Sequence, residues 1–153
     1  MTLATILAVH LLLALVWVGG MFFAYQVLRP VAATGLEPPQ RLPLWRGVFS
    51  RFFPWVWVSI AVLLGSGYGL IFFFYGGFAG ADVHIHLMQV TGLAMTALFI
   101  YLYFTPWRRF RDAVASDAFA DAAKNLNRIR LIVTVNLVIG LLTVISGAGG
   151  RFW

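Results

Sequence analysis

Four long stretches without a charged residue dominate the hydrophobic pattern of the chain. They cover residues 1–28, 52–81, 83–107 and 131–150. Each is at least as long as the roughly 20 residues that an α-helix needs to cross the hydrocarbon layer of a membrane. The pattern predicts a single domain over residues 1–153, with four transmembrane helices at about residues 3–28, 52–76, 84–107 and 127–146.

Two connections between these helices carry most of the polar residues. The Arg29-Pro30 pair is predicted to end the first helix, because proline disfavours a helical predecessor. Residues 32–47 contain several prolines and polar groups, which indicates an interfacial loop. Residues 108–130 have apolar residues at helical spacing among mixed charges, which favours a surface helix or an extension of helices three and four.

Composition supports membrane residence. Hydrophobic residues make up 61% of the chain and charged residues only 10%, whereas soluble domains have about 25% charged residues. The first apolar stretch lacks a basic segment before it and is longer than the roughly 7–15 residues of a secretory signal, so we expect it to be retained. The fold class is therefore predicted to be an all-α four-helix bundle in a membrane.

The positions of the basic residues predict the orientation. Ten of the 11 Lys and Arg residues lie in the first and third connections, and none lies in the second. The first and third connections of a four-helix chain share one side, which the positive-inside rule places in the cytoplasm. We therefore expect both termini outside the cytoplasm of a bacterial inner membrane. The net charge of +6 is explained by topology and lipid contacts, and no nucleic-acid partner is expected.

The residue types and motifs that the chain lacks exclude several classes of chemical site. The chain has no cysteine, which excludes disulfides and thiolate metal sites. It has no glycine-rich phosphate loop, no HExxH pattern and no paired carboxylates within the apolar stretches, so phosphoryl transfer and hydrolysis find no support. Any chemistry is expected to be redox or metal-borne.

The three histidines are the candidate functional residues. His10 lies about 10 Å below the outer boundary of helix one, by the helical rise. His84 and His86 stand at the outer start of helix three, so the predicted topology brings all three imidazoles to the same half of the membrane. Polar side chains at such depth are costly and rare. We therefore treat each histidine as a functional hypothesis.

Two cofactors suit these residues. Positions 84 and 86 point roughly 200° apart on a helix, so only one of them can face His10. The leading hypothesis is a heme b with His10 and His86 as axial ligands and with Trp17 and Gly20 beside it. The alternative is copper, which imidazole and thioether groups bind well. The candidate copper ligands are His10, His84, His86 and Met88.

Several of these residues also have a structural explanation that involves no cofactor. His84 next to Asp82 can be a wet loop residue, His10 can hydrogen bond to a neighbouring helix, and Met88 can be apolar filling. Ala61, Gly65 and Gly69 recur at intervals of four. This spacing indicates close helix packing within the bundle, a homodimer interface or the wall of a flat cofactor pocket.

Three segments carry a resemblance to known families. They are VHLLLALVWVGGMFF (9–23), HIHLMQVTGLAMTALFIYLYFTPWRRF (84–110) and NLNRIRLIVTVNLVIGLL (125–142). Together they resemble the CopD family of bacterial inner-membrane proteins, named for copper resistance. The chain length and the histidine of helix one also resemble HemJ-like proteins, which are heme-dependent protoporphyrinogen oxidases. The CopD resemblance implies copper handling through His and Met residues.

The HemJ-like resemblance implies a heme held by His10 and a His-x-Lys pattern at the next outer-face site. This chain has His86 where that pattern has lysine, so the oxidase activity does not carry over directly.

Three functional hypotheses remain open at this point. The first is a heme b redox protein, an oxidoreductase that transfers electrons to a membrane redox partner or a quinone. The second is a copper-binding or copper-transporting protein. The third is an accessory subunit of a membrane complex, in which the histidines only bond to neighbouring helices. Membrane lipids are expected partners in each case, and a homo-oligomer remains open.

Overall fold

The computed structural model describes residues 2–152, which contain helices and no strand. The elements are α1 (Leu3–Phe22), a π-helical segment (Phe23–Leu28), α2 (Arg29–Gly35), α3 (Pro38–Phe74), a 3₁₀ turn (Phe78–Gly80), α4 (Val83–Leu102), a second π-helical segment (Tyr103–Trp107), α5 (Arg108–Ala115), α6 (Phe119–Gly149) and a final 3₁₀ turn (Gly150–Phe152). Several of these run on without a break, so the described chain forms four long rods.

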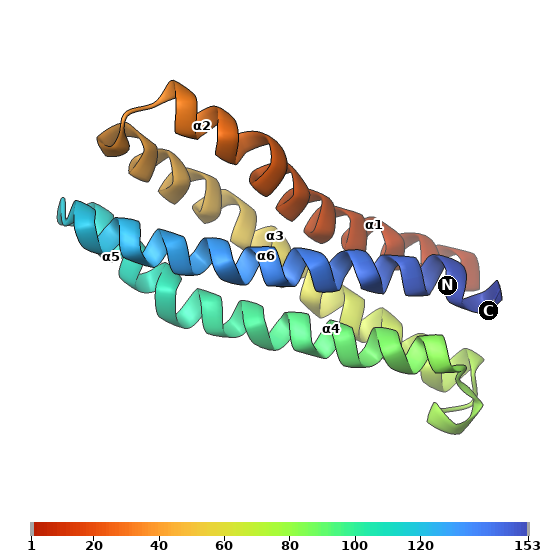
Figure 1. The fold of residues 1–153 in the computed structure, drawn as a ribbon. Coiled ribbons are helices and arrows are strands. Elements are labelled where there is room, and N and C mark those ends of the chain that lie inside the picture. Colours follow the sequence, from red (N-terminus) through yellow and green to blue (C-terminus); the bar gives the residue numbers. More distant parts are fainter. Residues whose placement is uncertain (1, 153) are drawn as a thin grey trace.

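The four rods are each long and apolar enough to cross a membrane. They cover Leu3–Gly35, Pro38–Phe74, Val83–Ala115 and Phe119–Gly149. Successive rods run in opposite directions, with α1 packed against α3 and α4 against α6 (Figure 1). The prediction of an all-α four-helix membrane protein is confirmed.

The two ends of the bundle differ in chemistry. Both termini and the α3–α4 connection lie at one end, which we call the histidine end because His10, His84 and His86 are nearest to it (Figure 1). The α2–α3 and α5–α6 connections lie at the opposite end, which we call the basic end. Ten of the 11 Lys and Arg residues lie toward the basic end.

The prediction of a loop over residues 32–47 is wrong. Helix α2 continues to Gly35 and α3 begins at Pro38, well before the predicted start near residue 52. The reason is favourable capping: Glu37 and Gln40 form a capping box, and prolines occupy the first positions of α3. Proline is tolerated there because the first N–H groups of a helix have no partner within it.

Proline also fails to end the first rod. The π-helical segment before Pro30 uses wider hydrogen bonds, such as that from the Arg29 N–H to the Ala24 carbonyl. Such a turn gives room where a proline ring and its missing N–H disturb the regular ladder. The second π-helical segment contains Pro106. Both rods therefore remain helical past their prolines, and they extend further toward the basic end than the predicted transmembrane helices.

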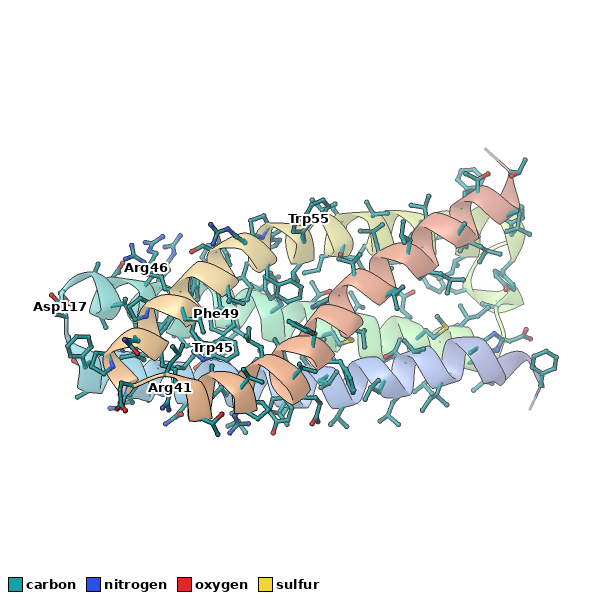
Figure 2. All side chains as sticks on the ribbon, turned by 90° about the horizontal axis from the view of Figure 1, so that it is seen from above. Arg41, Trp45, Arg46, Phe49, Trp55 and Asp117 are labelled. Atoms are coloured by element: carbon teal, nitrogen blue, oxygen red, sulfur yellow. The ribbon has the colours of Figure 1, made fainter. Side chains whose placement is uncertain are left out.

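Aromatic rings fill the half of the bundle toward the basic end. Phe49 and Phe53 stack with a centroid separation of 5.1 Å, and Phe53 meets the rings of Phe99 and Trp107 edge-on at 5.4 and 5.2 Å. Trp45 and Phe49 point from α3 into the bundle (Figure 2). Because α3, α4 and the second π-helical segment all contribute rings, this aromatic core holds those helices together.

Gly20 allows α1 to approach α3 in this half. A Cβ built on Gly20 would overlap the Phe52 ring, whereas one on Gly19 would meet only Leu15 at 3.9 Å. The structure therefore gives Gly20 a packing role at the α1–α3 contact.

Alanine at these two neighbouring glycines should have different effects on stability. Gly19→Ala should stabilise the protein by up to about 1 kcal/mol through helix propensity. Gly20→Ala should be less stable than Gly19→Ala by about 1–3 kcal/mol, because the Phe52 ring must move. Reversible unfolding in detergent with a mild denaturing surfactant measures both, and equal free energies of unfolding would contradict the proposed contact.

Candidate functional site

A cavity of about 450 Å³ lies in the histidine half of the bundle. Residues of α1, α3, α4 and α6 line it, and no Asp, Glu, Lys or Arg is among them. The polar lining residues are His10, Tyr68, Tyr75, His84, Gln89, Thr96 and Thr143. Most of the remaining wall is aliphatic, glycine or methionine, so the cavity is an apolar space with a few neutral polar groups.

His10 is held in a defined orientation. Its Nδ1 lies 2.7 Å from the Ser66 hydroxyl, and that hydroxyl donates to the Val62 carbonyl at 2.6 Å. A serine hydroxyl has one proton. Since this proton goes to Val62, the Ser66 oxygen accepts from the Nδ1–H of neutral His10. The Nε2 atom of His10 then carries the lone pair, which is the arrangement typical of a metal-ligating histidine whose other nitrogen is hydrogen bonded.

A second polar pair connects α3 to α4 at the cavity wall. Gln89 donates from Nε2 to the Tyr68 hydroxyl at 2.5 Å. Because that hydroxyl accepts from Gln89, its own proton is available as a donor. The pair places one oriented O–H group among the apolar lining residues.

Helix α4 contributes the other metal-ligating side chains of the lining, which are His84, Met88 and Met95. Two glycines of α6 give the methionines room. A Cβ on Gly147 would lie 2.9 Å from the Met88 Cε, and one on Gly140 would lie 3.1 Å from the Met95 Cε. The thioethers therefore pack directly against the α6 backbone on one side and line the cavity on the other.

The structure separates the two histidines of α4. His84 is half-buried and lines the cavity, whereas His86 is exposed and stacks on Phe78 with a centroid separation of 6.4 Å. The reason is the helical phase, which turns positions two apart to different sides. The predicted pairing of His10 with His86 across one cofactor therefore gains no support from the cavity, because the histidine of α4 that lines it with His10 is His84.

The other two residues predicted to lie beside the cofactor also differ in position. Trp17 lines the cavity and is 4% exposed, while Gly20 is not among the lining residues. No group of three or more His, Asp or Glu side chains that could hold a metal ion occurs within residues 2–152. A metal centre here would therefore need a thioether or an exogenous ligand beside the imidazoles.

A shallower groove runs along the outside of α1 and α3. It has a volume of about 360 Å³ and includes Ser66, Gly65 and Gly69 in its wall. Nothing lies within 4 Å of a Cβ built on either glycine. The interpretation of Gly65 and Gly69 as packing residues within the bundle is therefore wrong, because they face open space. Ser66 lines this groove and hydrogen bonds to His10, which lines the cavity.

Sequence reasoning missed two of the residues that define this site. They are Tyr68 and Gln89, whose hydrogen bond depends on how α4 packs against α3. Ser66 was visible as a polar residue inside an apolar stretch, but its contact with His10 requires the packing of α1 on α3.

Comparison with known proteins identifies a family. Residues 46–149 match the family model described as Copper resistance protein D. No curated protein and no solved structure matches this chain. The matched region contains α4, α6 and most of α3, whereas His10 lies before it. The comparison supports the CopD part of the resemblance and leaves the HemJ-like part as an expectation.

Removal of the Ser66 hydroxyl should release the His10 ring. Ser66→Ala should destabilise the protein by about 1 kcal/mol, because the Nδ1–H loses its acceptor. The imidazole ¹⁵N chemical shifts of His10 should change from a pure Nδ1–H tautomer to a mixture. NMR of selectively labelled protein in detergent micelles measures this change.

Ser59→Ala is the matched control. Ser59 is fully buried in the same helix and its hydroxyl has no hydrogen-bond partner, so its removal should be neutral or stabilising and should leave His10 unchanged. Equal effects of the two alanines would argue against the Ser66–His10 hydrogen bond.

Proposed function

Because this chain belongs to the copper resistance protein D family, we propose that it binds copper(I) as its cargo in the cavity at the histidine end. The observation that carries the proposal is the fixed orientation of His10, whose Nε2 lone pair is left free by the Nδ1 contact with Ser66. The chain itself is a multi-pass membrane protein of the copper-resistance type.

The ligand set supports a soft metal. Imidazole nitrogens of His10 and His84 and thioether sulfurs of Met88 and Met95 line the same cavity. Thioethers select copper(I) over harder cations, and imidazole also binds it well. Carboxylates, which Mg²⁺ and Ca²⁺ require, are missing from the lining residues.

The charge of the ion supports the lower oxidation state. All lining residues are neutral when the histidines are neutral, so an ion in the cavity meets no compensating carboxylate. The cost of moving an ion from water into an apolar medium rises with the square of its charge and is on the order of 20 kcal/mol for a monovalent ion in the idealised case. Copper(I) therefore suits this cavity better than copper(II).

Copper binding should depend on the histidines that line the cavity and not on His86. Purified protein titrated with copper(I) against a chromophoric chelator, without oxygen, should bind the metal. His10→Ala should weaken the affinity at least about tenfold, and Ser66→Ala should weaken it roughly 10–100-fold, the range seen when a partner of a metal ligand is removed. His86→Ala is the control and should bind like the unaltered protein, because His86 is exposed and outside the cavity.

Two results would contradict this proposal. One is the absence of copper(I) binding by the folded, unaltered protein. The other is a loss of affinity in His86→Ala that equals the loss in His10→Ala, because this would place the metal outside the cavity.

The size of the cavity favours heme b as a second candidate. A bare ion needs little more than the roughly 30 Å³ of one water molecule, whereas about 450 Å³ falls in the range of pockets that hold organic ligands. His10 and His84 would hold the iron from α1 and α4, with Trp17 as an apolar wall. A heme so bound supplies one-electron transfer, and an oxidoreductase activity toward a quinone or a porphyrin belongs to this candidate.

An absorption spectrum distinguishes the two candidates. Protein purified from cells well supplied with heme should show a Soret band if heme b is the resident cofactor, and His10→Ala should lose it. A colourless protein that binds copper(I) would exclude heme b. A colourless protein that binds no copper would favour the remaining hypothesis, an accessory subunit of a membrane complex.

The orientation of the bundle follows from the same charges that predict its topology. We propose that the basic end faces the cytoplasm of a bacterial inner membrane and that the cavity opens toward the outer face, as the positive-inside rule implies. The absence of cysteine in the chain makes this directly measurable with single-cysteine variants.

Single cysteines should label from opposite sides. Thr2 and Ser116 are both exposed, at the histidine end and at the α5–α6 connection respectively. In intact cells stripped of their outer membrane, an impermeant maleimide should modify Thr2→Cys and spare Ser116→Cys. Permeabilised cells should label both, and the reverse pattern in intact cells would invert the proposed orientation.

A further inference from the structure

Three arginines from three different rods converge at the basic end. Arg29 begins α2, Arg41 lies in the first turns of α3 and Arg130 lies in α6. The positive charges of Arg29 and Arg41 both act unfavourably on the charge of Arg130. Like charges that repel one another in this way are stabilised when an anion or water compensates them.

The protein offers these arginines only neutral acceptors. Arg41 donates from Nη2 to the carbonyls of Ala33 and Leu36 at 3.1 and 2.9 Å, and Arg130 donates from Nη1 to the Asn127 side chain at 3.3 Å. The one ion pair found in the part of the chain that the structure describes is Arg111–Asp112, elsewhere at this end. The nearby carboxylate of Glu37 is already engaged in the capping box of α3.

Several N–H donors at this place have no partner. They are Nε of Arg41, Nε of Arg130 and Nε1 of Trp45, all of them buried. The Arg130 guanidinium lies 5.8 Å from the centre of the Trp45 ring. Arg41 and Trp45 lie close together at this end of α3 (Figure 2). Unsatisfied buried donors next to uncompensated positive charges point to an anionic acceptor that binds between the helices.

The depth of the cluster indicates where that acceptor comes from. Arg29 lies over the Tyr25 ring at 5.0 Å, and Trp45 is 3% exposed. Tyr, Trp and Arg gather at the level of the lipid headgroups. Basic pockets between transmembrane helices bind anionic headgroups at this level.

We propose that Arg29, Arg41 and Arg130 bind the phosphate group of an anionic phospholipid at the basic end. A phosphodiester spreads one negative charge over two oxygens, and guanidinium groups match such oxygens with paired N–H donors. The bound headgroup links α2, α3 and α6, so it ties together three rods that meet beyond the aromatic core. This site is independent of the cavity and of the metal proposed for it.

Lipid binding by matched variants tests the site. Protein in a neutral detergent is mixed with phosphatidylglycerol or with zwitterionic phosphatidylcholine, and native mass spectrometry counts the lipids that stay bound. Phosphatidylglycerol should be retained in preference to phosphatidylcholine. Arg130→Gln should lower its affinity roughly 10–100-fold, the range for one hydrogen bond to a charged group.

Arg128→Gln is the matched control, because Arg128 has the same charge, lies two residues away in α6 and is exposed. It should bind phosphatidylglycerol as the unaltered protein does. Arg29→Gln serves as a second variant if Arg130→Gln does not fold, and it should show the same loss. Equal effects at positions 128 and 130, or equal retention of the two lipids, would overturn the proposal.

A soluble phosphate is the alternative source of the same chemistry. Inorganic phosphate at millimolar concentration should leave the bound phosphatidylglycerol in place. Displacement of the lipid by inorganic phosphate would overturn the lipid assignment and indicate a site for a soluble phosphate compound.

Discussion

Interlocked aromatic rings hold one half of this bundle together, and the other features depend on that constraint. Phe53 is in contact with three other rings at edge-on angles, and the cluster spans α3, α4 and the second π-helical segment. In lipid there is little hydrophobic force between helices, so this packing is what fixes their spacing. With the helices secured in one half, the other half can stay apart and enclose a cavity without loss of the fold.

The cavity also distinguishes the two histidines of α4. His84 lies on the face of α4 that turns inward and His86 on a face that turns outward. Ser66 orients His10 through a hydrogen bond to Nδ1, and Ser66 also lines the outer groove. One serine hydroxyl therefore sets the tautomer of the ring that lines the cavity.

The sequence alone predicts the four rods and the two chemically different ends of the bundle. Both depend on hydrophobicity and charge summed over long stretches of the chain. The sequence was not sufficient where a few local contacts determine the structure. Glu37 and Gln40, for example, cap the start of α3 in a proline-rich segment that was predicted to be a loop. The sequence places His10, His84 and His86 in one half of the membrane. It does not show which of His84 and His86 lines the cavity, because that depends on the rotation of α4 about its axis. The arginine cluster has the same cause, because Arg29, Arg41 and Arg130 meet only after three rods have packed.

The separation of the two ends also bears on the choice of metal. A heme carries two anionic propionates, which need cations or water. The cavity lining supplies no Lys or Arg, and the clustered arginines lie beyond the aromatic core at the opposite end. A heme would therefore have to turn both propionates toward water at the histidine end, with its apolar edge against Trp17. Copper(I) needs no such arrangement, because the imidazoles and thioethers that line the cavity are the ligands it prefers.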